Sequence, residues 1–412
     1  MHMLQIRSLC AFLWIMEILD TLPLDRTDPF EPPAVLKELQ GALHPMTYAD
    51  GRPGWLVTGY TEARAVLDDP RFSNSTQGGG GAPPIKELMP PEGLTDWVIP
   101  PGFFIAMDDP DHSRFRRLLT GHFSMRKMRR LEPRIQEIID GQLEEMARGG
   151  APADLVQAFA LPVPSLVICE LLGVPYGDRA HFQDTTARAV NLDNSAEQRG
   201  VAHAELMAYL SELVARKRAE PGEDLISELA AGGELAHDEL TGVAALLLTA
   251  GHETTANMLS LGAFLLLCRP EQAELVRTDP GVAQTAVEEL MRYLSITHIG
   301  PIRVARADVP LAGRTIKAGE TVTISIPAVN RDETRFPDPD RFDVTRQAGA
   351  QLGFSHGIHQ CLGQQLARLE MRLAYPALLR RFPGLRLAVP AGEVTLRPRA
   401  TIYGVAALPV TW

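Results

Sequence analysis

The most informative segment of the chain reads Gly353-Phe354-Ser355-His356-Gly357-Ile358-His359-Gln360-Cys361-Leu362-Gly363, a glycine-punctuated loop that holds one cysteine. Residues 364–382, which follow it, are rich in Leu, Ala, Arg and Glu at helical spacing. We therefore expect Cys361 near a helix N-terminus, where unpaired backbone N–H groups stabilise negative charge and lower the pKa of a thiol. Gly357 and Gly363 lack a Cβ atom, so the backbone can turn tightly and a large flat ligand can approach the sulfur. The segment predicts a thiolate site.

The same loop resembles the haem-binding loop of cytochromes P450, in which Phe, two glycines, a basic residue, Cys and Gly recur at this spacing. The matching residues are Phe354, Gly357, His359, Cys361 and Gly363. Ser355 departs from the pattern, because the family most often has Gly there. A lone cysteine is more often buried and inert. The resemblance instead implies that Cys361 is the thiolate ligand of the iron in haem b, with His359 and Gly363 beside the cofactor.

Composition predicts a globular protein with a large core, since 45% of the 412 residues are hydrophobic and 22% are charged. No low-complexity linker or internal repeat divides the chain, so we expect one domain over residues 24–412 after an N-terminal extension over residues 1–23. The extension holds an apolar run at 9–16 that is too short to span a bilayer and lacks a following cleavage pattern. We expect it to be amphipathic or poorly ordered, without membrane association.

Charge and cysteine content narrow the choice of partners. The formal net charge of −11 argues against binding to nucleic acid, which needs a basic surface. The cysteines form no C-x-x-C pair, which disfavours a disulfide framework, a zinc knuckle and covalent haem attachment. They are Cys10, Cys169, Cys268 and Cys361. We expect a cytoplasmic monomer that binds small molecules and other proteins.

Periodicity predicts a mainly α fold with small β-sheets, and the resemblance implies the cytochrome P450 fold, a single helical domain that encloses the haem. Helices are expected at 61–68, 112–121, 125–148, 164–172, 179–192, 197–218, 238–268 and 282–293, and strands near 54–58, 302–304, 321–326 and 401–410. Four consecutive glycines at 78–81 predict a flexible loop over residues 76–84, which in P450s covers the substrate.

The predicted helix at 238–268 is apolar nearly all round, which indicates burial. A transmembrane interpretation fails at the centre of this helix, where His252, Glu253, Thr254, Thr255 and Asn257 would lie in hydrocarbon. A zinc site of the HExxH type fails as well, because position 256 is Ala rather than His. The polar residues therefore form a buried site or a satisfied core network.

Thr254 lies four residues after Ala250, so its hydroxyl can bond the Ala250 carbonyl, or leave it open and bend the helix. The segment Ala250-Gly251-His252-Glu253-Thr254-Thr255 resembles the oxygen-activation segment of P450s, which lies over the haem. The resemblance implies that Ala250 contacts the cofactor, and that Glu253 is the acid and Thr254 the alcohol that supply protons during activation of O2.

Two further groups of charged residues match the family. Glu289 and Arg292 share a helix face, and the resemblance implies that they form a buried network with Arg341 of Pro339-Asp340-Arg341-Phe342. It also implies that His112, Arg116, Arg303 and His359 bind the haem propionates. The basic run Arg114, Arg117, Arg126, Lys127, Arg129 and Arg130 is either a solvated face or a dock for an acidic ferredoxin.

Taken together, the motifs resemble the soluble three-component P450s of actinomycetes. The resemblance implies a haem-thiolate monooxygenase that uses O2, with electrons from a ferredoxin and an NAD(P)H-dependent ferredoxin reductase. We expect a small to medium hydrophobic substrate, a secondary metabolite or a xenobiotic that is hydroxylated, with polar tuning from Thr249 or His298. Its expected contacts are Leu246, Thr249, Ile296, Ile299 and Ile402. Two alternatives remain open at this point: a peroxide-driven peroxygenase, and a thiolate-haem sensor without catalysis.

Overall fold

The computed structural model describes residues 19, 21–39, 41–75, 100–190, 194–398 and 400–412. The apolar run at 9–16 and the glycine-rich loop at 76–84 lie outside the described residues. Leu19 pairs with Met46 through a backbone bridge, and Leu22 is buried beside Tyr48 and Leu56. These two leucines, which the sequence analysis assigned to the N-terminal extension, belong to the folded body.

Helices dominate the structure, as predicted, and the α-helices lie mainly where periodicity placed them. They are α1 (Ala34–Glu38), α2 (Tyr60–Asp68), α3 (Asp111–Thr120), α4 (Met125–Gly149), α5 (Pro162–Leu172), α6 (Arg179–Val190), α7 (Ala196–Ala219), α8 (Leu225–Gly232), α9 (His237–Leu267), α10 (Pro270–Thr278), α11 (Ala283–Leu294), α12 (Ile326–Val329) and α13 (Gln364–Arg381). Helices α8 and α10 were not predicted. Both are short, so they offer little periodic signal.

Short helical turns link these helices. They are η2 (Phe104–Ala106), η3 (Gly121–Phe123), the π-helical turn η4 (Val156–Ala160), η5 (Tyr176–Asp178), η6 (Gly357–His359) and η7 (Ala391–Glu393).

The strands form small sheets rather than a barrel. They are β1 (Leu43–Thr47), β2 (Pro53–Val57), β3 (Phe72–Ser73), β4 (Ala153–Asp154), β5 (Ile302–Ala305), β6 (Val309–Leu311), β7 (Arg314–Ile316), β8 (Thr321–Ile324), β9 (Arg386–Leu387), β10 (Thr395–Leu396), β11 (Val405–Ala407) and β12 (Pro409–Thr411). The largest sheet has the order β1-β2-β8-β5-β3, with β2 and β8 parallel and in register from Gly54 opposite Thr321. Smaller sheets pair β10 with β11, β6 with β7, and β12 with β4 and β9.

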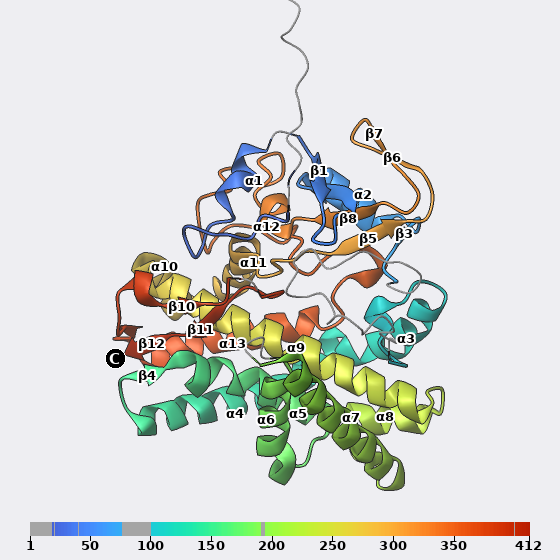
Figure 1. Ribbon diagram of the computed structural model, residues 1–412. Coiled ribbons are helices and arrows are strands. Elements are labelled where there is room, and N and C mark those ends of the chain that lie inside the picture. The colour runs from blue at the N-terminus through green and yellow to red at the C-terminus, as the bar shows by residue number, and fades with distance from the viewer. Residues whose placement is uncertain (1–18, 20, 40, 76–99, 191–193, 399) are drawn as a thin grey trace, which may run out of the picture.

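Helix α9 crosses the middle of the molecule, with the largest sheet on one side of it and helices α4 to α8 on the other (Figure 1). It begins where Glu239 accepts a hydrogen bond from the Ala236 backbone N–H at 2.9 Å, and most of its side chains are buried. Gly262 lets α13 pack closely, because a Cβ there would overlap the Tyr375 hydroxyl. That hydroxyl donates to the Met258 carbonyl at 2.5 Å. The α9–α13 contact fixes the two elements that carry the predicted site.

Among the described residues, no helix combines the length and the hydropathy that crossing a membrane would require.

Candidate active site

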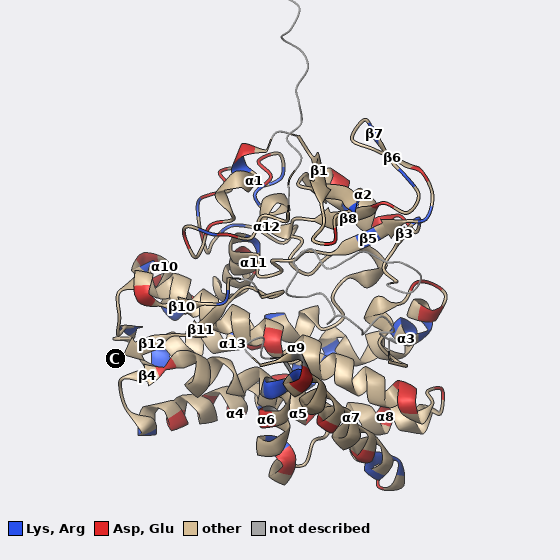
Figure 2. Ribbon diagram, in the orientation of Figure 1, with Lys and Arg blue, Asp and Glu red and all other residues tan. Residues whose placement is uncertain are grey.

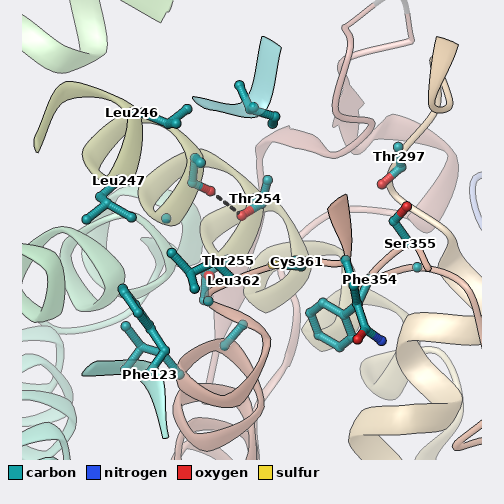
Figure 3. A pocket seen from close by; sticks show the side chains of 18 of the residues that line it. Phe123, Leu246, Leu247, Thr254, Thr255, Thr297, Phe354, Ser355, Cys361 and Leu362 are labelled. Carbon is teal, nitrogen blue, oxygen red and sulfur yellow. Dashed lines mark hydrogen bonds between the residues drawn. The ribbon is translucent and has the colours of Figure 1, made fainter. Parts of the chain in front are cut away.

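One cavity lies between α9 and the loop that holds Cys361 (Figure 3). Its empty volume is about 1430 Å³, including the open space at its mouth. Thr254 of α9 and Cys361 both line this cavity. The structure thus brings together the two motifs that the sequence analysis singled out.

The loop around Cys361 owes its shape to two residues with left-handed backbone. Gly357 has φ +71°, and a Cβ there would press on the Leu67 carbonyl. Ser355 has φ +61°, a conformation that favours glycine and so accounts for the residue usual at this position in the family. The turn closes where the Cys361 backbone N–H donates to the Phe354 carbonyl at 2.9 Å. Gly363 lines the cavity and precedes α13, as predicted.

The expected effect of the helix N-terminus on Cys361 is outweighed by burial. Backbone N–H groups of Gly363 and Gln364 lower the pKa of the thiol, as does the Arg116 guanidinium. Burial is the largest influence, however, and it raises the pKa above its ordinary value. The prediction of a lowered thiol pKa is therefore wrong for the protein by itself. A thiolate here calls for a cationic partner such as a metal ion, which deprotonates a coordinating thiol outright.

The α9 wall of the cavity carries the predicted acid and alcohol in different settings. The Thr254 hydroxyl donates to the Ala250 carbonyl at 2.7 Å, which is the first of the two options considered for this pair (Figure 3). Ala250 and Thr254 both line the cavity. Glu253 does not, because its carboxylate pairs with Arg397 at 3.0 Å. No pattern around Glu253 indicates Arg397, which lies 144 positions further along the chain after β10.

Replacing Arg397 with Gln is expected to move proton supply by Glu253 to higher pH. Burial raises the pKa of the Glu253 carboxyl above its ordinary value, and Arg397 opposes that rise. Without the guanidinium the pKa rises further, so the protonated carboxyl persists to more alkaline pH. The alkaline limb of product formation against pH should shift upward in Arg397→Gln and stay near its original position in Arg397→Lys. An unshifted limb in Arg397→Gln would separate Glu253 from proton supply.

The rim of the cavity gathers positive and unpaired groups. His112, Arg116 and His359 line it, and the two imidazole rings lie 4.1 Å apart between centroids. Nδ1 of His112 and Nε2 of His359 are buried without a hydrogen-bond partner among the described residues. Burial, together with His112, Arg303 and Arg116, lowers the pKa of His359 to about 3. Ring nitrogens without a hydrogen-bond partner beside the Arg116 guanidinium suit an anionic group, so these residues fit haem propionates.

Arg303, a predicted propionate ligand, lies outside the cavity lining. It is buried, and it donates to the Asn74 side chain and to the Ile302 carbonyl. It does not line the cavity, although it acts on His359 electrostatically. Within the described residues no cluster of three or more His, Cys, Asp or Glu could hold a metal ion.

The predicted charge network is present with a different third member. Glu289 and Arg292 are wholly buried and pair at 2.7 Å. Arg341 contributes only its backbone carbonyl, and its side chain is 66% exposed beside Asp343. The guanidinium that reaches Glu289, at 3.1 Å, belongs to Arg346. The assignment of Arg341 is thus wrong, because both arginines lie in one irregular segment and its path decides which side chain turns inward.

Some of the predicted substrate contacts line the cavity and others do not. Leu246 and Ile296 line the cavity as predicted. Thr249 does not, since its hydroxyl bonds the Ala245 carbonyl at 2.9 Å. Ile299 is buried in the cluster around Leu22, and Ile402 packs against the main core. These three assignments are therefore not supported by the geometry.

His298 does not reach the cavity either, because it is buried edge-on against Tyr403. Lining residues that the sequence analysis missed include Phe104, Phe123, Leu247, Thr255, Thr297 and Glu370. Thr297 directly follows Ile296, and Thr255 and Leu247 flank predicted residues. Proximity in the sequence was thus the one available signal for these three.

Acidic and basic residues are interspersed along α3 and α7, whereas the charged residue of α8 is Glu228 (Figure 2). Arg114, Arg117 and Lys127 of the predicted basic run pair with Glu239, Glu234 and Glu228 respectively. Arg126, Arg129 and Arg130 are exposed on α4. The basic run is thus partly neutralised, and α4 carries what remains of it.

The chain resembles known proteins along nearly its whole length. A family model described as "Cytochrome P450" matches residues 281–391. The sequence is 48% identical over 393 residues to "Cytochrome P450 105C1" of a Streptomyces species, covering 94% of this chain and 97% of that protein. It is 46% identical over 396 residues to "Pentalenic acid synthase" of Streptomyces avermitilis, covering 95% and 96%. The crystal structure of cytochrome P450 MoxA from Nonomuraea recticatena matches with a TM-score of 0.89 at 45% identity, covering 95% and 98%.

Proposed function

The chain belongs to the cytochrome P450 family of haem monooxygenases, and from that premise we propose that it inserts one oxygen atom of O2 into a hydrophobic secondary metabolite or xenobiotic. The observation that carries the proposal is the shared cavity, which Thr254 lines from α9 and Cys361 from the opposite loop. Haem, when bound by Cys361, supplies the redox chemistry that activates O2. The chain's own residues then orient the substrate, restrain water and hold protons.

The lining of the cavity supports a small to medium hydrophobic substrate. Side chains such as Phe104, Phe123, Leu247 and Ile296 make its walls mostly apolar. Its few polar groups include Thr297, which can orient a hydroxyl or carbonyl of the substrate. The name of the relative "Pentalenic acid synthase" supports a biosynthetic role, and we propose hydroxylation as the reaction.

We further propose that electrons come from a ferredoxin and its NAD(P)H-dependent reductase in the cytoplasm, with the chain acting as a monomer. The exposed arginines of α4, Arg126, Arg129 and Arg130, offer an acidic ferredoxin a basic surface. Cys169, Cys268 and Cys361 are free thiols, which suits a reducing compartment. Triple substitution of these arginines by Glu should weaken ferredoxin binding. Binding by this variant should also fall less steeply with rising salt concentration than binding by the wild type.

The experiment that tests the function is a substrate screen followed by turnover. Compounds that displace water from the cavity change the haem spin state, and those that bind are then assayed with NAD(P)H, ferredoxin and reductase. We expect oxygenated product whose new oxygen derives from labelled O2. A thiolate-haem sensor would bind ligand without product. A peroxygenase would turn over far faster with peroxide than with the redox partners.

Thr254→Ala is expected to uncouple the reaction. Loss of the hydroxyl removes a proton-supplying group from the cavity, so product per NAD(P)H should fall roughly tenfold or more while peroxide accumulates. Ser260→Ala is the matched control. Its hydroxyl also donates to the carbonyl four residues earlier, at 2.9 Å, but it lies in the core away from the cavity. Unchanged coupling in Thr254→Ala would remove Thr254 from proton supply.

A further inference from the structure

Arg26, His298 and Tyr403 form a polar cluster beside the cavity but outside its lining. The central carbon of the Arg26 guanidinium lies 4.1 Å from the centre of the Tyr403 ring. The His298 ring meets the same tyrosine edge-on, with 5.2 Å between the ring centroids. His298 is 3% exposed and Tyr403 is 1% exposed. The three side chains are thus neighbours in an almost closed environment.

Four polar atoms of this cluster are unpaired. The Nε atom of Arg26, both ring nitrogens of His298 and the hydroxyl of Tyr403 are buried without a hydrogen-bond partner among the described residues. Burying such groups without a partner is costly, and structures normally avoid it. Burial, followed by the charge of Arg26, lowers the pKa of His298 to about 3. The imidazole is therefore neutral, with one N–H donor and one acceptor.

Arg26 also has no ion pair among the described residues. Its two Nη atoms donate to the carbonyls of Leu294 and Ser295, at 3.3 and 3.4 Å. Glu31 attracts the guanidinium from a longer distance, but the Glu31 carboxylate already pairs with Arg331 at 3.3 Å. Burial lowers the pKa of Arg26 to about 10, so the side chain remains charged at neutral pH. A cation in this setting favours a negative ligand.

We propose that Arg26, His298 and Tyr403 bind one small monovalent anion, such as chloride, which serves as the counterion of Arg26. Three donors are available to it, namely the guanidinium Nε–H, the phenolic O–H and the imidazole N–H. The ligand must be small because its surroundings are nearly closed. One guanidinium supplies a single positive charge, which favours a monovalent ion over phosphate or sulfate. This inference goes beyond the proposed function and does not depend on it.

The bound anion also fastens one wall of the cavity. Ile296 and Thr297 belong to that wall. The Tyr403 backbone N–H donates to the Ile296 carbonyl at 2.8 Å, and the His298 N–H donates to the Thr401 carbonyl at 3.2 Å. His298 and Tyr403 thus stand on two paired segments, one of which forms the wall. An anion held by both side chains links these segments a second time.

Bromide tests the site directly, because it replaces chloride and scatters X-rays anomalously. Crystals of the haem-loaded protein grown in sodium bromide should show an anomalous peak in contact with the Arg26 Nε atom and the Tyr403 hydroxyl. The peak should be missing from crystals of Arg26→Met. Density for water alone at this position, without anomalous signal, would overturn the proposal.

Thermal unfolding tests the same site in solution. The midpoint of the haem-loaded protein should rise by about 2 °C when sodium chloride replaces sodium gluconate at equal ionic strength, because a ligand that binds only the folded state stabilises it. Gluconate is too large for the site. The rise should vanish in Arg26→Met. An equal midpoint of the wild type in both salts would contradict anion binding.

Two tyrosines separate anion binding from a merely structural role. Tyr403→Phe removes one donor, so the chloride concentration that gives half of the rise should increase roughly tenfold. This variant also serves as the test if Arg26→Met does not fold. Tyr375→Phe is the control, because Tyr375 is equally buried but donates to the Met258 carbonyl. It should melt lower and keep the wild-type chloride response. An unchanged half-effect concentration in Tyr403→Phe would exclude Tyr403 from the site.

Hydrogen exchange measures the effect on the cavity wall. In chloride, the Tyr403 amide that donates to Ile296 should exchange more slowly than in gluconate, because the anion holds the two segments together. Arg26→Met should show no such difference between the salts. Equal exchange rates in the wild type would show that the anion does not fasten the wall.

Discussion

Cys361→Ser should abolish the red-shifted absorbance of the ferrous carbon monoxide complex and reduce monooxygenase activity to background. The red shift depends on a thiolate that donates electron density to iron, and an alcohol in the same place is a far weaker acid and a harder ligand. The structure gives iron no second cysteine, since Cys361 is the cysteine that lines the cavity within the described residues. No neighbouring side chain is therefore positioned to take over as a thiolate.

The control for this substitution is Cys268→Ser. Cys268 is a free thiol that is neither fully buried nor part of the cavity lining, so the carbon monoxide band and activity should match the wild type. Haem content per polypeptide should be measured in both variants, because loss of haem would remove the band without reporting on the ligand. A red-shifted band in Cys361→Ser would show that the thiolate assignment is wrong.

Glu289→Ala should lower the free energy of unfolding by about 3–5 kcal/mol and leave the protein largely without haem, because it strands Arg292 as an unpaired buried charge. Arg292 also donates to the carbonyls of Asn330 and Pro339, at 3.0 and 2.8 Å. The Asn330 side chain in turn accepts from the Leu352 N–H at 2.8 Å, immediately before the cysteine loop. The network thus holds the chain that leads to Cys361, which explains why haem binding should fail together with stability.

The same network supplies its own control. Arg341→Ala should change the unfolding free energy by no more than about 0.5 kcal/mol, because the Arg341 side chain is exposed and only its carbonyl joins the network. Arg346→Ala should fall between the two, since it breaks an ion pair with Glu289 whose other partner remains. Chemical denaturation and haem absorbance per polypeptide measure both effects. An Arg341→Ala variant as damaged as Glu289→Ala would restore the original assignment.

Local patterns predicted most of the fold and the two halves of the site. The helical period placed α9 and α13 to within a residue or two. All residues of the cysteine motif lie in one loop, so the motif could be recognised from the sequence without knowledge of any tertiary contact. Strands were predicted less fully. β6 and β7 went unrecognised because strands of three residues carry little alternation.

Sequence by itself therefore determined the family, the haem prediction, the thiolate candidate, and Ala250 and Thr254 of α9, which line the same cavity, because each depends on residues close together in the chain. Tertiary structure decided that Arg346 rather than Arg341 reaches Glu289, and that Arg397 holds Glu253 outside the cavity. It also placed Thr249, Ile299 and Ile402 away from the cavity and Glu370 in its wall. Periodicity gives the face of a helix, but the distant side chain that meets that face depends on packing. Whether a charged group then gains a partner or is buried without one depends on the same packing, and so does its pKa.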